Sequence, residues 1–152
     1  LGLVGVLVVV LGEGVSVGVD SVGEGVEVGV DIEDLTDADF EGFAAATLAR
    51  DEVAGFDGLD GHDLLVARAR VWARKEAVLK ATGRGLVVDP SEVLVSAPRD
   101  PARLVDWRAD EPRPPMIALA DVDPTTPDHR AAVAALTGDT RRLPHLHGTT
   151  KA

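Results

Sequence analysis

Two carboxylates stand two residues apart at the end of a valine-rich stretch, Val26–Glu33, and they are the first side chains able to do chemistry. On a β-strand, residues i and i+2 point to the same side, so Asp31 and Glu33 are predicted to project from one face. Two carboxylates about 4 Å apart repel each other by roughly 4 kcal/mol at an effective dielectric constant near 20. The pair therefore takes up a proton, separates into water or shares a cation. Gly29, on the same side, is expected to leave this face open to a ligand. The alternative for the two acids is that they form a solvated strand end without a ligand.

A third acid and a lysine occupy a segment with the composition of a long helix, from about Asp63 to Thr82. Trp72, Glu76 and Lys80 are spaced i, i+4 and i+8, so they line one helical face over two turns. Trp72 is expected to pack rather than to contact a ligand. A glutamate four residues before a lysine is also the order of an ordinary surface pair, worth about 0.2–0.5 kcal/mol. Taken alone, the spacing favours such a surface pair.

Taken together, the two segments resemble the 4′-phosphopantetheinyl transferase superfamily. The resemblance lies in VGVDIE at Val28–Glu33 and in WARKEAVLKATGRGL at Trp72–Leu86, which follow the family pattern of a D-x-E strand and a W-x-x-K-E-A-x-x-K-x-x-G-x-G-L helix. LARDE at Leu48–Glu52 is similar to a short L-x-x-x-E element of the family. The later stretches VDPSEVLVS and HRAAVAALTG resemble the closing strands of the larger, two-lobed (Sfp-type) class, which modifies carrier domains of polyketide and non-ribosomal peptide synthases.

The resemblance implies an enzyme that moves the phosphopantetheine arm of coenzyme A onto a serine of an acyl or peptidyl carrier protein. It implies that Asp31, Glu33 and Glu76 hold Mg²⁺ against the pyrophosphate of coenzyme A, since Mg²⁺ prefers carboxylate and phosphate oxygens. The catalytic residues would be Glu76, which takes the proton of the incoming serine, and Lys80, which steadies the leaving 3′,5′-ADP. Lys75 and Lys80 would bind coenzyme A. Lys75 points about 100° away from Glu76 and is expected to reach a phosphate or an acid of the carrier protein.

Enzymes of the larger class carry a Ser-His element within an N-terminal lobe, before the D-x-E strand. No histidine precedes His62 here, so the resemblance implies a C-terminal lobe whose N-terminal lobe is missing or truncated. The smaller, trimeric class has about this length and builds its site between subunits, but the closing strands fit the larger class better. An alternative function is a catalytically inactive, truncated remnant that acts only as a binding or structural domain.

The charge of the chain restricts its partners. The 152 residues carry a net charge of −11, which argues against nucleic-acid binding, and no Lys or Arg precedes Arg50. A basic segment between His62 and Leu86 suits a small anionic ligand better than a long polyanion. The longest apolar run, Leu1–Leu11, is too short to span a membrane and lacks the basic flank of a signal peptide. With no cysteine in the chain, a cytoplasmic protein without disulfides or membrane association is expected.

The pattern of apolar residues predicts an α+β fold, with an antiparallel sheet packed on a long helix that Gly83 ends. A shorter helix is expected from Thr36 or Asp37 to about Arg50, followed by a loop over residues 51–61. Strands are predicted in the following stretches: residues 26–33, 92–96, 103–107, 116–120 and 131–136. The domain is expected to cover residues 1–138, with an irregular Val/Gly-rich segment at 1–25, before a loose tail at 139–152.

Two similar phrases precede the helices: GEGVSVGVD at Gly12–Asp20 and GEGVEVGVD at Gly23–Asp31. Only the second copy continues to an acid two residues beyond its aspartate, because Asp20 is followed by Ser21 and Val22. The first copy is therefore expected to have a structural or accidental role.

Overall fold

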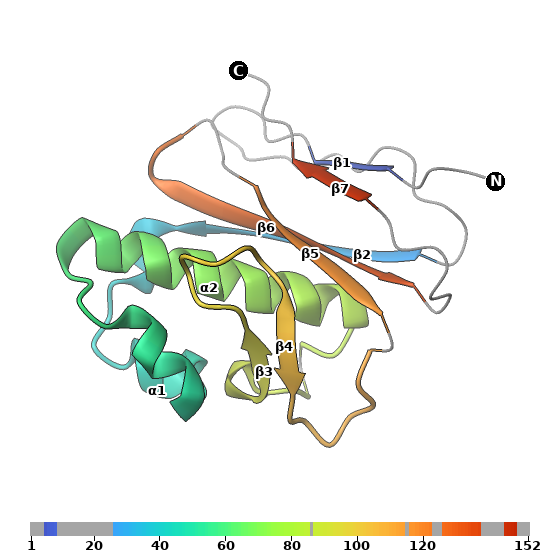
Figure 1. Ribbon diagram of the computed structural model, residues 1–152, viewed down its shortest axis with the longest axis horizontal. Helices are drawn as coiled ribbons and strands as arrows, with labels where there is room; N and C mark the ends of the chain where they lie inside the picture. Colours follow the sequence, from blue (N-terminus) through green and yellow to red (C-terminus); the bar gives the residue numbers. More distant parts are fainter. Residues whose placement is uncertain are drawn as a thin grey trace.

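The centre of the molecule is a long helix, α2 (Gly61–Thr82), which lies between a three-stranded sheet and a separate antiparallel strand pair (Figure 1). The computed structural model describes residues 5–8, 26–85, 87–114, 116–122, 126–137 and 145–148. This architecture confirms the predicted α+β fold, with an antiparallel sheet packed on a long helix. In the described part of the chain, no helix is both long and apolar enough to cross a bilayer.

The sheet consists of β2 (Val26–Asp34), β6 (His129–Thr137) and β5 (Ile117–Val122), all antiparallel, with β6 in the middle. In its register Asp31 lies opposite Ala132. The predicted strands at 26–33, 116–120 and 131–136 are confirmed, each with slightly different ends.

Helix α2 ends where the sequence indicates. Gly83 adopts a left-handed conformation, with φ of 69°, and its backbone N–H lies against the carbonyl groups of Leu79 and Lys80. Glycine accepts this conformation without the steric cost that a Cβ would bring. The predicted helix over Asp63–Thr82 is confirmed, and it begins two residues earlier, at Gly61.

Gly29 determines how closely β2 approaches α2. A Cβ built on Gly29 would lie 2.1 Å from the carbonyl oxygen of Ala77 and 2.3 Å from the backbone nitrogen of Ala81. The expectation that Gly29 opens a face to a ligand is therefore wrong, because the helix backbone covers it. The glycine allows strand and helix to pack in direct contact, and so brings the acids that follow it against α2.

The opposite face of the sheet is apolar. Val28, Val30 and Ile32 of β2 pack there with Val133 and its neighbours on the central strand. On this side lie β1 (Gly5–Val8) and β7 (His145–Gly148), which pair in parallel (Figure 1). These two strands fall within the segments 1–25 and 139–152, which were expected to be irregular and loose. The first copy of the repeated phrase lies outside the described residues.

The segment between β2 and α2 differs from its prediction. It forms a 3₁₀ turn η1 (Leu35–Ala38), a short helix α1 (Phe43–Thr47) and a second 3₁₀ segment η2 (Arg50–Phe56), instead of one helix to Arg50 and a loop. The break after α1 has a physical cause. Leu48 and Ala49 are extended, and the Glu52 carboxylate accepts a hydrogen bond from the Ala49 backbone at 2.8 Å, which stabilises the new turn.

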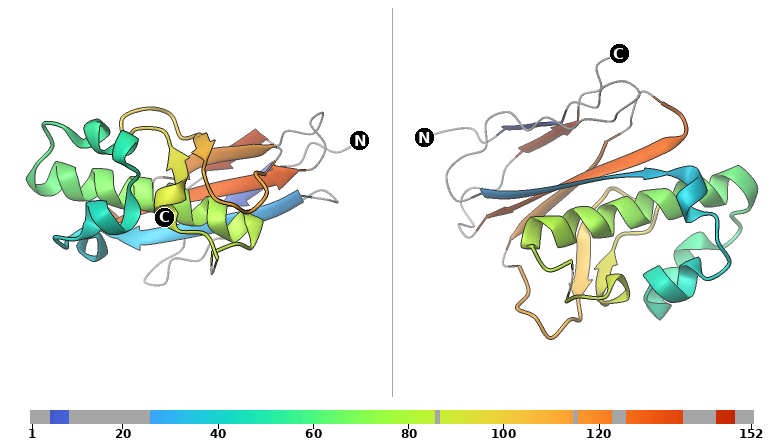
Figure 2. Two further views of the ribbon diagram at one scale, coloured as in Figure 1. Left: turned by 90° about the horizontal axis from the view of Figure 1, so that it is seen from below. Right: turned by 180° about the vertical axis from the view of Figure 1, so that it is seen from behind.

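The remaining layer covers the far side of α2. A 3₁₀ turn η3 (Pro90–Glu92) leads into β3 (Val93–Val95), which pairs with β4 (Leu104–Trp107), as predicted for 92–96 and 103–107. Figure 2, seen from behind, shows this pair on the side of α2 away from the three-stranded sheet. The helix is consequently enclosed on both sides, and several of its side chains are fully buried.

Candidate functional site

Strand β2 and helix α2 bring the acidic side chains of the sequence prediction together. Asp31 and Glu33 lie on the helix-facing side of β2, and Glu76 lies on α2 opposite them. The negative charges of Asp31 and Glu76 both act on Glu33, so the three carboxyl groups lie in the same region between β2 and α2. Asp31 is buried, with 6% of its surface exposed, whereas Glu33 and Glu76 are half-buried.

Lys80 is also part of this cluster. Its Nζ donates to Asp31 Oδ1 at 2.8 Å, and about half of the lysine side chain remains exposed (52%). The second oxygen, Asp31 Oδ2, is buried and accepts no hydrogen bond from an N–H, hydroxyl or ammonium group of the described residues, although the Glu33 carboxyl group lies within hydrogen-bond reach of Asp31. A buried carboxylate oxygen without a donor is unfavourable, so this atom is available to a further cation or donor.

The crowding of acids changes their protonation. The pKa of Glu33 is raised from 4.5 to about 9, mainly by burial; a hydrogen bond with Asp31 and the negative charges of Asp31 and Glu76 act in the same direction. Burial, together with the charge of Asp31, also raises the pKa of Glu76, while Lys80 opposes the shift. Of the three outcomes expected for the acid pair, the raised pKa of Glu33 favours uptake of a proton, and the Lys80 ammonium lies against Asp31 alone.

These residues fit a divalent cation, although they are not already arranged as a complete set of ligands. Among the described residues, no three His, Asp or Glu side chains form a ready metal site. The fit rests on the donor chemistry: three carboxyl groups of the kind that Mg²⁺ prefers, one of them with an unpartnered buried oxygen. The ligand set Asp31, Glu33 and Glu76 remains a prediction.

Lys75 has a different position from the one predicted. Its side chain is fully buried, and Nζ donates to the Glu52 carboxylate, to the Pro90 carbonyl at 2.9 Å and to the Val93 carbonyl at 2.8 Å. Burial lowers the pKa of Lys75, and the charge of Glu52 partly opposes this shift. All three donors of the ammonium are used inside the protein. The expectation that Lys75 reaches a phosphate of coenzyme A or an acid of the carrier is therefore wrong.

Trp72 packs, as predicted. Its ring lies 5.6 Å from that of Phe43 and 6.3 Å from that of Phe40, centroid to centroid. These distances are typical of aromatic pairs in cores. The cluster joins the middle of α2 to α1 and to the turn before α1, and therefore helps to fix the part of the helix that carries Glu76.

The sequence prediction missed Arg74, the largest of the fully buried side chains among the described residues. Its guanidinium makes two bonds to Asp121 on β5, at 2.6 and 2.7 Å, and donates to three carbonyl groups in residues 96–100. The basic residues of α2 therefore do not all face one anionic ligand, because both Arg74 and Lys75 point into the protein. A signal was available, since Arg74 stands three residues after Val71 and four before Val78, the residues that mark the buried side.

Comparison with known families identifies the sequence. A profile described as the 4′-phosphopantetheinyl transferase superfamily matches residues 27–137. Comparison with curated protein sequences gives no match.

Solved structures of similar fold are synthases of the small, single-lobe type. A holo-(acyl-carrier-protein) synthase from Bacillus anthracis str. Ames, in complex with CoA (3′,5′-ADP), aligns with a TM-score of 0.62 at 23% identity, covering 74% of this chain and 96% of its own. The Thermotoga maritima holo-[acyl-carrier-protein] synthase aligns with a TM-score of 0.57 at 21% identity, covering 77% and 71%. The holo-ACP-synthase from Plasmodium yoelii aligns with a TM-score of 0.56 at 20% identity, covering 75% and 95%. At these identities the likeness is one of fold.

Proposed function

The chain belongs to the 4′-phosphopantetheinyl transferase superfamily, and from this premise we propose that it transfers the 4′-phosphopantetheine arm of coenzyme A to a serine of an acyl or peptidyl carrier protein. The observation that carries the proposal is the meeting of Asp31 and Glu33 from β2 with Glu76 and Lys80 from α2. These are the four side chains that the family pattern places in the site. The solved relative that holds CoA (3′,5′-ADP) supports coenzyme A as the donor.

The proposed reaction is a phosphoryl transfer. The carrier serine oxygen attacks the phosphorus that bears the pantetheine arm, and a new Ser O–P bond forms. The P–O bond to the bridging oxygen of the pyrophosphate breaks, and 3′,5′-ADP leaves with that oxygen. Catalysis of such a step depends on positioning and on neutralising charge as it develops, rather than on covalent chemistry by the protein.

Glu76 is proposed as the general base that takes the serine proton. A base works best when its pKa lies near the working pH, and burial moves the pKa of Glu76 upward from its ordinary value. The half-buried position leaves the carboxyl group accessible to a docked serine. The aromatic packing of Trp72, one turn earlier, holds this part of the helix in place.

Lys80 is proposed to neutralise a phosphate of coenzyme A and the leaving 3′,5′-ADP. It is half-exposed and lies one turn after Glu76, so its ammonium can move from Asp31 toward a ligand above the cluster. Its long, flexible side chain suits a point charge that changes partner.

We also propose that the transfer depends on Mg²⁺ held by Asp31, Glu33 and Glu76. When bound, Mg²⁺ would supply positive charge that stabilises the pyrophosphate as its bond breaks. The unpartnered Oδ2 of Asp31 and the raised pKa of Glu33 support this assignment, because both are the result of acids gathered without enough positive charge.

Within the superfamily, we propose the larger, two-lobed (Sfp-type) class, with carriers of polyketide or non-ribosomal peptide synthesis as substrates. The support is the sequence resemblance of the closing stretches, VDPSEVLVS and HRAAVAALTG, which include β3 and β6. The single-lobe synthases share the fold of this chain and do not separate the two classes.

The activity is tested directly by mixing the protein with coenzyme A, Mg²⁺ and an apo carrier protein. Mass spectrometry should show the carrier gaining the phosphopantetheine arm. Glu76→Gln should abolish the gain, and Glu27→Gln is the matched control, since Glu27 is an exposed acid on the same side of β2. A Glu76→Gln protein as active as its parent removes Glu76 from the mechanism.

A second measurement separates an inactive remnant from an enzyme that was given the wrong carrier. Coenzyme A should raise the melting temperature in the presence of Mg²⁺, because a ligand at 100 times its dissociation constant adds about 2.7 kcal/mol of stability. No shift at millimolar coenzyme A supports the remnant. A shift without carrier modification indicates that another carrier is the substrate.

A further inference from the structure

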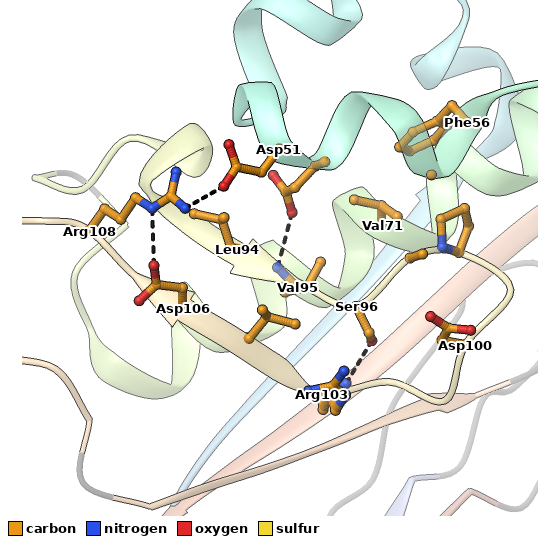
Figure 3. Close-up of a pocket in the computed structure, with 15 residues that line it drawn as sticks. Asp51, Phe56, Val71, Leu94, Val95, Ser96, Asp100, Arg103, Asp106 and Arg108 are labelled. Carbon is orange, nitrogen blue, oxygen red and sulfur yellow. Dashed lines mark hydrogen bonds and ion pairs between the residues drawn. The ribbon is translucent and has the colours of Figure 1, made fainter.

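A cavity of about 370 Å³ lies between η2 and the β3–β4 pair, apart from the acidic cluster (Figure 3). It has the size of a small-molecule site, since such sites occupy about 300–1,000 Å³. Arg108 lies at one end with Asp51 and Asp106, and Asp100 and Arg103 lie toward the other end.

The cavity and the acidic cluster belong to different sides of α2. Val71 lines the cavity and Glu76 belongs to the cluster. Five residues apart on a helix, they point about 140° away from each other. An occupant of the cavity therefore does not compete with coenzyme A at the carboxyl groups.

Two buried ionic groups hold the walls of the cavity. The Glu52 carboxylate accepts from the Val95 backbone at 3.0 Å and also binds Lys75, which joins η2 to β3. Arg74 donates to the carbonyl groups of Ser96, Ala97 and Asp100 at 2.9 to 3.0 Å, which fixes the turn at the other end. The cavity is consequently formed before any ligand binds, and this lowers the entropic cost of binding.

Its lining is apolar in the middle. The side chains that provide this surface are Phe56, Val71, Leu94, Val95 and Val105. Val105 is 43% exposed and leaves an apolar surface at the edge of the cavity. A ligand with an apolar body would cover it.

The charges at one end of the cavity are already paired. Arg108 binds Asp51 at 2.7 Å and Asp106 at 3.0 Å, and the same arginine holds the pKa of both carboxyl groups below their ordinary value.

At the other end, Asp100 and Arg103 are exposed to solvent, and their side chains form no hydrogen bond or ion pair with any described residue. The cavity lining therefore has one unpaired negative group, Asp100, and one unpaired positive group, Arg103, beside its apolar surface.

We propose that this cavity binds an apolar α-amino acid, whose ammonium group pairs with Asp100, whose carboxylate pairs with Arg103, and whose side chain lies on the valine, leucine and phenylalanine floor. A molecule with only one charge leaves one of the two groups without a partner. The proposal is independent of the transferase activity, because it concerns a site on the other side of α2.

The test uses L-leucine and two analogues that each lack one charge: 4-methylpentanoate, without the ammonium, and 3-methylbutylamine, without the carboxylate. Calorimetric titration of the full chain should show saturable binding of L-leucine. Each analogue should bind at least about tenfold more weakly, as expected for the loss of one charge-assisted hydrogen bond. Equal binding of all three, or no saturable binding of L-leucine, overturns the proposal.

Variants locate the site. Arg103→Gln should weaken L-leucine about tenfold and leave 3-methylbutylamine unchanged, since that amine has no carboxylate. Asp100→Asn should weaken L-leucine and leave 4-methylpentanoate unchanged. Arg99→Gln, in the same turn but outside the cavity lining, is the matched control and should bind like the parent. An Arg103→Gln protein with unchanged L-leucine affinity contradicts the proposal, and circular dichroism confirms that each variant is folded.

Discussion

Lys80 on α2 and Asp31 on β2 form an ion pair of 2.8 Å, and the second oxygen of that aspartate has no N–H, hydroxyl or ammonium donor among the described residues. The lysine therefore partly neutralises an acid that the proposed reaction also requires for a metal ion. Binding of a divalent cation to Asp31 would weaken the attraction of this aspartate for Lys80 and would free the ammonium for a phosphate. The ion pair links the two proposed roles, metal binding and phosphate binding, in one contact.

Replacement of Lys80 by methionine should destabilise the metal-free protein and increase the stabilisation that Mg²⁺ provides. Asp31 would remain buried without its counter-ion, which costs about 1–3 kcal/mol, less than for a fully buried pair because Lys80 is half-exposed. Urea unfolding with and without Mg²⁺ measures both effects. Arg84→Met, which removes an exposed cation that pairs with Glu111 at 3.3 Å, is the control. A Lys80→Met protein that gains no more from Mg²⁺ than its parent contradicts the competition between lysine and metal.

The metal-free protein should lose stability as the pH rises from about 5 to 9. Glu33 has a folded-state pKa of about 9 against an ordinary value of 4.5, so between these values the folded chain holds a proton that the unfolded chain has released. Its contribution is fully present below the unfolded pKa and is lost as the pH approaches the folded pKa. Urea midpoints at successive pH values measure the slope. Glu33→Gln should flatten it, and an unchanged slope in that variant assigns the effect to other groups.

Gly29→Ala should destabilise the fold by about 3 kcal/mol or more, at the upper end of overpacking effects. The new methyl group would overlap the carbonyl oxygen of Ala77 and the nitrogen of Ala81, both of which belong to the helix backbone and cannot rotate away. Gly42→Ala is the matched control, because its Cβ meets only the Phe40 ring, at 3.9 Å. Thermal unfolding measures both, and equal stabilities would show that β2 and α2 can separate without cost.

Lys75→Met should lower stability by about 3 kcal/mol or more, because it leaves the Glu52 carboxylate buried without a cation. The affinity for coenzyme A should remain unchanged under conditions where the variant is folded, since Lys75 has no exposed donor. Denaturant unfolding and a coenzyme A titration together decide the point. A stable Lys75→Met protein with weakened coenzyme A binding would show that Lys75 does contribute to coenzyme A binding.

Local patterns in the sequence predicted much of this structure. Alternation along β2 correctly separated Asp31 and Glu33 from the apolar face that carries Val28 and Val30. Gly83 correctly marked the end of α2. The segment over residues 35–56 was predicted wrongly, because Glu52, which the sequence placed in a loop, bonds to the distant Val95 and Lys75 and so stabilises η2.

The sequence by itself determined which side chains share a strand face or a helix face, because those relations depend only on the two-residue and 3.6-residue repeats of the backbone. It also contained the family pattern, since that pattern is a matter of residue type and spacing. Only the tertiary structure decided that Gly29 lets α2 lie against β2, that Lys80 reaches Asp31, and that Arg74 and Lys75 point inward. These outcomes depend on which element covers which face, and contacts between residues distant in the chain fix that choice.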